Sequence, residues 1–241
     1  MLLEIMQEYL DKLQETLITD FPGHLQCLIL YGSWAKGTAK KDSDIDLLAV
    51  FDRADGEMRR KVWEVAQNVG REVTIVVADL EEFSSEINPI YTAIKKEGKV
   101  IWGKADLSVH PDPPPVKYAK FFKRSEEFES QKIRIAKDLI DKGYHSGVME
   151  LCYVASKHAI QAALAMKGEG YSSKVAILMP LAQKYLGNEI AEAFKRLFDL
   201  YVKSEYGMET ISGEEAKKAV EYAKVIWKVY SNGAAGSSPR Q

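Results

Sequence analysis

The sequence predicts an α+β protein in which a small domain with a mixed sheet is followed by an all-α helical bundle. Apolar residues follow both strand and helix periods over about the first 105 positions, whereas the period is helical throughout after Val116. Between the two patterns lies His110-Pro111-Asp112-Pro113-Pro114-Pro115, which predicts an extended, fairly stiff linker. We expect a first domain at 1–110, a linker at 111–116, a bundle at 117–231 and a disordered tail at 232–241.

The elements of the first domain follow from local signals. Phe21-Pro22-Gly23 ends an amphipathic first helix, and Asp79 and Asn88 are N-cap residues, the second followed by a proline in the first turn. We expect Trp63 on the inward face of its helix. The expected helices are 2–18, 33–39, 57–68, one beginning at Asp79, and 89–96, and the expected strands are 25–31, 44–51, 72–78 and 99–103.

The second half reads as an up-and-down bundle with short connections. Gly143 and Gly168 end its first two helices, and Ser172 is expected to cap the third. The long faces of such a bundle suit a homodimer, which is our expectation for its assembly. The expected helices are about 117–142, 145–167, 172–186, 188–203 and 213–230.

Composition narrows the function classes. The 241 residues carry a net charge of −2, so no global charge points to a nucleic-acid or membrane partner. Residues 1–115 hold 13 Lys+Arg and 20 Asp+Glu, and the rest of the chain holds 20 Lys+Arg and 15 Asp+Glu. This imbalance indicates either a basic surface for an anionic ligand or chance.

Cys27 and Cys152 lie in apolar runs, which predicts that both are buried free thiols. No apolar run approaches the 18 residues that a membrane span needs. We expect a cytoplasmic protein without a signal peptide.

The stretch around which the chain is organised lies between the first two strands. Gly32 and Ser33 end the first strand, and Asp44 and Asp46 open the second. Because successive strand residues point to opposite faces, the two aspartates share a face. Mg²⁺ binds through one or two carboxylates plus substrate phosphates, so this stretch predicts a metal and a phosphate site. The alternative is an ordinary turn with two solvated aspartates.

The same loop supplies groups that suit phosphate. Gly32 permits a tight turn and close backbone approach, and Ser33 offers a hydroxyl and a backbone N–H. Ser43 stands directly before the first aspartate, where its hydroxyl could support phosphate or metal. Lys36, Lys40 and Lys41 either contact triphosphate oxygens or are ordinary solvated lysines.

Gly32-Ser33, ten intervening residues and Asp44-x-Asp46 are similar to the signature of the DNA polymerase β-like nucleotidyltransferase superfamily, most of all to the minimal nucleotidyltransferases of prokaryotes. The resemblance covers about the first 105 residues. It implies Mg²⁺-dependent transfer of a nucleoside monophosphate from a nucleoside triphosphate, with ATP as the expected donor, to a hydroxyl, with release of pyrophosphate. The acceptor would be a small molecule such as an aminoglycoside-type hydroxyl compound, a protein side chain or RNA.

The resemblance also implies a third carboxylate on the third strand, acting as the base. Thr74 stands where that aspartate is expected. Glu72 lies on the same face and is our candidate for catalytic base and third metal ligand, beside Asp44 and Asp46. If the Glu72 side chain does not reach Asp44 and Asp46, the site has only these two carboxylates. A non-catalytic nucleotide-binding or regulatory, antitoxin-like protein is then the alternative, and a helical interaction scaffold is a third hypothesis.

The second half resembles the HEPN family, whose bundles are often paired with minimal nucleotidyltransferases. The resemblance rests on a long helix with a small-residue face around His158 and on the helix end Leu200–Gly207. Ribonuclease members carry an Arg five positions before a His, and the four histidines are instead preceded at that distance by Thr19, Ala105, Ile140 and Tyr153. We therefore expect no ribonuclease activity by that mechanism. His158 is expected to pack between helices, and Tyr201, Lys203, Glu205 and Tyr206 either meet substrate or form a helix cap.

Overall fold

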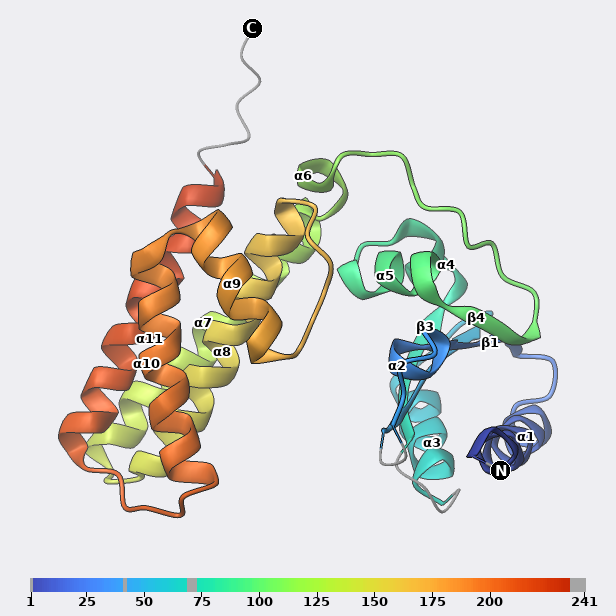
Figure 1. Cartoon of the computed structure of the whole chain (residues 1–241), viewed down its shortest axis with the longest axis horizontal. Helices are drawn as coiled ribbons and strands as arrows, with labels where there is room; N and C mark the ends of the chain where they lie inside the picture. Colours follow the sequence, from blue (N-terminus) through green and yellow to red (C-terminus); the bar gives the residue numbers. More distant parts are fainter. Residues whose placement is uncertain (1, 41–42, 69–72, 235–241) are drawn as a thin grey trace, which may run out of the picture. The chain divides into compact units, whose positions relative to one another are not determined.

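The computed structural model describes residues 2–40, 43–68 and 73–234. It comprises two compact units, Met1–Pro111 and Asp112–Gln241. Unit 1 combines helices with a four-stranded mixed sheet and unit 2 is helical, which confirms the predicted fold class (Figure 1). Within the described ranges, no helix combines the length and apolar character that crossing a membrane requires.

The sheet of unit 1 has the strand order β3-β2-β1-β4. β1 is antiparallel to both β2 and β4, and β2 is parallel to β3, so the ends of β1 and β2 that flank the Gly32–Asp44 loop lie side by side. The strands are β1 (Leu25–Tyr31), β2 (Ile45–Phe51), β3 (Val73–Asp79) and β4 (Lys99–Gly103).

Helices cover both faces of this sheet (Figure 1). α1 and α3 pack with alternate β2 residues such as Leu47 on one face, and α4 and α5 pack with Leu48 and Val50 on the other. Asp79 and Asn88 cap α4 and α5 through their side chains, as predicted. The helices are α1 (Leu2–Asp20), α2 (Gly32–Ala35), α3 (Gly56–Gln67), α4 (Leu80–Ser85) and α5 (Pro89–Glu97).

The prediction that Trp63 of α3 faces the core is wrong. Val62 and Ala66, one turn apart, are fully buried against the sheet, but the Trp63 side chain is 57% exposed. Consecutive helix positions are about 100° apart, so a helix resting on Val62 and Ala66 turns Trp63 toward solvent. Hydrophobicity alone placed Trp63 in the core, and the helix orientation overrides it.

Unit 2 is built around α8, which packs against α7, α10 and α11. Several positions on α8 are small, including Ala155, Ala159 and Ala162, and this lets neighbouring helices approach closely. Cys152 in this core and Cys27 in β1 are both buried and free, as predicted. The helices are α6 (Pro114–Lys117), α7 (Ala119–Asp141), α8 (His145–Met166), α9 (Val175–Leu186), α10 (Asn188–Glu205) and α11 (Gly213–Ala234).

Two predicted features of the second half differ in the structure. The predicted extended linker contains a helical turn, α6, because Pro114 and Pro115 occupy first-turn positions, where no backbone N–H is required. α9 begins at Val175, and Ser172 does not cap it. Instead the Ser172 carbonyl accepts a 2.6 Å hydrogen bond from the Gln161 side chain, which ties this segment to α8 before the helix begins.

A buried carboxylate holds the segment that follows β4. Glu86 is fully buried and accepts hydrogen bonds from Thr92 Oγ1 at 2.5 Å, Lys95 Nζ at 2.9 Å and the His110 backbone N–H at 2.8 Å. Charge-assisted hydrogen bonds of this kind compensate the cost of burying the carboxylate. They fasten the end of unit 1 to α5.

Candidate functional site

β2 places the two predicted carboxylates at one end of the sheet. Asp44 immediately precedes the strand and is exposed, whereas Asp46 is its second residue and is partly buried. Strand alternation puts Asp46 on the face of Leu48 and Val50, which α4 and α5 cover farther along the strand. The Asp46 carboxylate therefore lies beyond the apolar contact with these helices, at the end of the sheet, where its side chain is partly exposed.

Gly32 lies directly beneath the Asp46 side chain. Its φ of +69° is in the left-handed region, and a Cβ at this position would lie 2.1 Å from Asp46 Oδ2. Any other residue would therefore be strained and would collide with the carboxylate. The predicted phosphate turn and the predicted metal ligand are thus parts of one arrangement.

Three polar residues form one row across the sheet at this end. Tyr31 of β1 and Thr74 of β3 are the register partners of Asp46 on either side. Burial raises the pKa of the Tyr31 hydroxyl, and the negative charge of Asp46 raises it further. Thr74 is exposed beside Asp46, so the position expected to carry a third acid presents a hydroxyl.

The candidate base Glu72 and the candidate phosphate contact Lys41 lie outside the described residues. Within the described ranges, no group of three or more His, Cys, Asp or Glu side chains is placed to hold a metal ion. The oxygen donors of Asp44 and Asp46 nevertheless suit Mg²⁺, which uses one or two carboxylates and takes its other ligands from phosphates and water.

Two residues make hydrogen bonds within the described part of the segment between Gly32 and Asp44. The indole Nε1–H of Trp34 donates to the Ser43 carbonyl at 3.1 Å, and Ser43 Oγ accepts from the Lys40 backbone N–H at 2.8 Å. Ser43, the residue that precedes Asp44, thus links to Lys40 through its hydroxyl, a role that the sequence did not suggest for it. The sequence analysis assigned no role to Trp34, which is buried in the structure. A large aromatic residue within a polar loop is a sequence signal for such a buried position.

Lys36, predicted to contact phosphate, lies in an ion pair. Its Nζ is 2.7 Å from Oε2 of Glu97, the last residue of α5. Both side chains are about half exposed, at 48% and 44%. No sequence signal pointed to Glu97, because it is far from the loop along the chain.

Unit 2 contains a second polar cluster, centred on Glu129 of α7. This carboxylate is 4% exposed and accepts hydrogen bonds from His158 Nδ1 at 2.8 Å and Lys132 Nζ at 2.6 Å. Burial raises the Glu129 pKa, but the hydrogen bonds from His158 and Lys132 outweigh burial, so the pKa lies below its usual value. His158 therefore joins α8 to α7, in keeping with the packing role predicted for it.

We expect Glu129→Gln to lower the free energy of unfolding by about 1–3 kcal/mol, because charge-assisted hydrogen bonds are lost in a buried site. Since the folded-state pKa is the lower one, this stability exists above the unfolded pKa of about 4.3 and is lost as the pH falls through the folded pKa. Melting temperatures of the wild type and Glu129→Gln should therefore differ at pH 7 and converge in acid. Glu127→Gln, an exposed site on the same helix, is the control. Equal melting temperatures at pH 7 would contradict the assignment.

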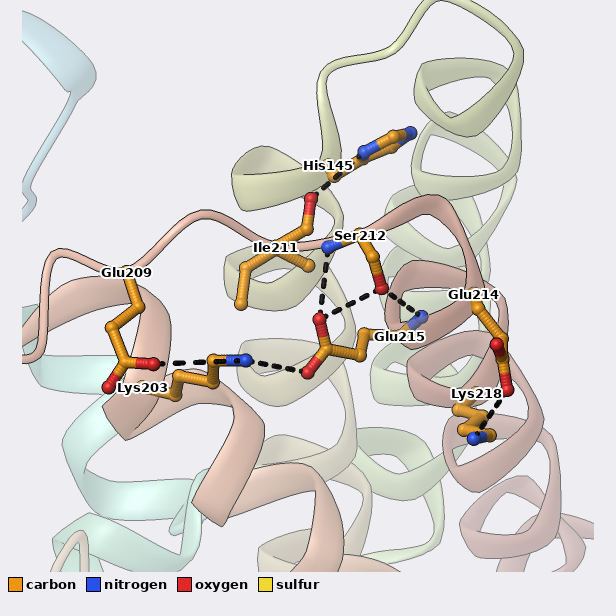
Figure 2. Close-up of polar contacts among 8 residues, drawn as sticks. All are labelled: His145, Lys203, Glu209, Ile211, Ser212, Glu214, Glu215 and Lys218. Atoms are coloured by element: carbon orange, nitrogen blue, oxygen red, sulfur yellow. Dashed lines mark hydrogen bonds and ion pairs between the residues drawn. The ribbon is translucent and has the colours of Figure 1, made fainter.

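The predicted polar cluster at the end of α10 joins α10 to α11 (Figure 2). Lys203 Nζ lies 2.8 Å from Glu215 Oε1, and Glu215 Oε2 accepts from both the backbone N–H and the hydroxyl of Ser212. The hydrogen bond from Lys203 is the largest cause that lowers the pKa of Glu215 to about 2, followed by those from Ser212. Ser212 Oγ in turn accepts from the Glu215 backbone N–H, which is the reciprocal arrangement of a capping box. Lys203 therefore ties the last turn of α10 to the capping box at the start of α11.

Two family models match the chain. The nucleotidyltransferase domain model matches residues 10–101, and the HEPN domain model matches residues 122–233. Both resemblances stated from the sequence are thereby confirmed.

A curated relative matches part of the chain. The protein adenylyltransferase MntA of Shewanella oneidensis is 32% identical over 88 residues, which cover 36% of this chain and 60% of that protein. The chain therefore spans about 60% of the length of this relative.

Two solved structures match the chain at low sequence identity. Spectinomycin adenyltransferase AAD(9) of Enterococcus faecialis, crystallised with ATP and spectinomycin, is 16% identical, with a TM-score of 0.47 and coverage of 91% of this chain and 98% of that one. A tri-AMPylated HEPN toxin of Shewanella oneidensis in complex with the MNT antitoxin gives 16% identity, a TM-score of 0.29 and coverage of 56% and 97%.

The family matches agree with the site that the fold builds. The matched range 10–101 contains Gly32, Asp44 and Asp46 with the strands that carry them, and 122–233 spans most of the bundle. The chain therefore joins a nucleotidyltransferase domain, matched over residues 10–101, to a HEPN domain, matched over residues 122–233.

Proposed function

We propose that this protein transfers an adenylyl group from ATP to a hydroxyl acceptor and releases pyrophosphate. The observation that carries the proposal is the close approach of the Asp46 carboxylate to the Gly32 turn. It supports a site in which an acid that would bind metal lies beside a backbone turn suited to phosphate. The choice of ATP is supported by the name of the relative that is 32% identical over 88 residues, a protein adenylyltransferase.

In this reaction the acceptor oxygen forms a bond to the α-phosphorus of ATP, and the bond from that phosphorus to the β-phosphate oxygen breaks. Asp44 and Asp46 would hold Mg²⁺, which supplies charge neutralisation on the phosphates when bound. The Gly32–Ser33 turn and Lys36 would position the triphosphate. Glu72 is proposed to take the proton from the acceptor hydroxyl.

The test uses the full chain with Mg²⁺ and ATP labelled at the α-phosphate. We expect pyrophosphate release together with label transfer to one of three acceptor classes: hydroxyl-rich small molecules of the aminoglycoside type, protein or RNA. EDTA should abolish both signals, and ATP labelled at the γ-phosphate should transfer nothing. Absence of pyrophosphate release with every acceptor class would refute the activity.

A second candidate function is nucleotide binding without turnover, as in a regulatory protein. It is favoured by Thr74, which pairs in register with Asp46 at the place expected for a third acid.

The second candidate predicts that Thr74→Asp produces pyrophosphate release that the wild type lacks, because a carboxylate then stands beside Asp46. If Glu72 is the base, Glu72→Gln should instead lower release by about 10²–10⁴-fold, the usual contribution of a general base. Both rates are measured by pyrophosphate release, with ATP affinity as the control. ATP binding that is retained without turnover would favour the regulatory function, and failure to bind any nucleotide would favour an interaction scaffold.

A further inference from the structure

The ion pair between Lys36 and Glu97 joins two segments of unit 1 that carry the site. Lys36 directly follows α2, the short helix that begins at Gly32 beneath the Asp46 carboxylate. Glu97 ends α5, which packs on the face of the sheet that carries Asp46, and α2 also contacts α5. The pair therefore stands at the edge of the proposed nucleotide site.

The backbone is firmly held on both sides of this pair. The Lys36 N–H donates to the Gly32 carbonyl at 3.2 Å, and the Thr38 N–H donates to the Ser33 carbonyl at 3.0 Å. After Glu97, the Gly98 N–H donates to the Ile94 carbonyl at 2.7 Å, and a Cβ on Gly98 would lie 2.6 Å from that same oxygen. Only the two flexible side chains are thus available to break or remake the contact.

The pair itself is easily broken. Both side chains are about half exposed, and exposed Lys–Glu pairs contribute little to stability because water screens them. A triphosphate carries several negative charges and accepts hydrogen bonds from an ammonium more strongly than one exposed carboxylate does. The Glu97 carboxylate offsets part of the positive charge of Lys36, so Lys36 attracts a triphosphate less strongly while the pair is formed.

We propose that Glu97 is a positioning residue that competes with ATP for Lys36: its carboxylate holds the ammonium beside the site until the triphosphate displaces it. This inference rests on the proposed function. The affinity for ATP therefore depends on how strongly Glu97 holds Lys36 away from the phosphates. Removing its charge leaves Lys36 unpaired and strengthens ATP binding.

The experiment is a double-mutant cycle on the full chain, with the affinity for ATP and Mg²⁺ measured by isothermal titration calorimetry. We expect Glu97→Gln to tighten binding by about two- to fivefold, the range that an exposed ion pair allows. Lys36→Gln should weaken binding, and adding Glu97→Gln to it should change nothing further. The gain in Glu97→Gln should also shrink at high salt, where the pair is screened.

Glu57→Gln is the matched control, since Glu57 forms a similar exposed pair with Lys61 on α3 at 2.9 Å. It removes the same charge and should leave ATP affinity unchanged. An unchanged or weaker affinity in Glu97→Gln, or an equal gain in the Lys36→Gln background, would overturn the inference. Failure of the wild type to bind ATP would overturn both this inference and the proposed function, whereas wild-type binding without the coupling would overturn this inference alone.

Discussion

Replacing Gly32 by alanine is expected to reduce ATP-dependent pyrophosphate release by about 100-fold or more, the effect of displacing a catalytic group by an ångström. The new Cβ would lie 2.1 Å from Asp46 Oδ2, so the carboxylate must move away from the turn. The substitution also places a non-glycine residue at a φ of +69°, which costs about 1–2 kcal/mol. The measurements are pyrophosphate release and the melting temperature of the same preparation.

Gly23→Ala separates the two effects of this change. Gly23 has a similar φ of +78°, but a Cβ there meets no atom within 4 Å. This control should lose about the same stability as Gly32→Ala and keep its activity. Equal activity losses in the two variants would show that backbone strain, and not the displaced carboxylate, is responsible.

The second large effect is expected from Asp46→Asn. The amide keeps the shape of the side chain but loses the charge that we propose binds Mg²⁺, and such an ion contributes several kcal/mol to reactions of this kind. We expect Mg²⁺-dependent pyrophosphate release to fall by about 10²–10³-fold. The folded state should be retained, because the partly buried side chain keeps its volume.

The same variant has a readout that does not depend on catalysis. Asp46 contributes to the raised pKa of Tyr31, its neighbour across the β1–β2 ladder. Asp46→Asn should therefore lower the Tyr31 pKa, although burial keeps it above the usual value, and this is measurable by ultraviolet or NMR titration. Asp52→Asn, just after the other end of β2, removes one charge and should change neither readout. Full activity in Asp46→Asn would refute the site assignment.

Local signals in the sequence predicted most elements of the fold. Asp79 and Asn88 are helix caps in the structure, because a cap depends on a side chain and a backbone N–H two or three residues away. The period of the apolar residues likewise predicted β1 and β2. It therefore placed Gly32 after the first strand and Asp44 and Asp46 at the start of the second. Trp63 shows where this reasoning ends, since the rotation of α3 on the sheet depends on residues of other elements.

The candidate site also has a part that the sequence predicts and a part that only the fold brings together. The motif residues are close in sequence, and strand alternation alone predicts a common face for Asp44 and Asp46. The contact of Asp46 with Gly32, the pairing of Thr74 with Asp46 and the ion pair between Lys36 and Glu97 each join separate elements.

The sequence by itself determined that this chain carries a glycine turn and two aspartates between two strands, ahead of a helical bundle. The tertiary structure decided which groups meet there: strand register brings Thr74 beside Asp46, and the packing of α5 on the sheet brings Glu97 to Lys36. The physical reason is the distance along the chain over which each kind of interaction acts. Caps, turns and periodicity act over a few neighbouring residues, whereas such pairings depend on how buried apolar faces fit together across the whole unit.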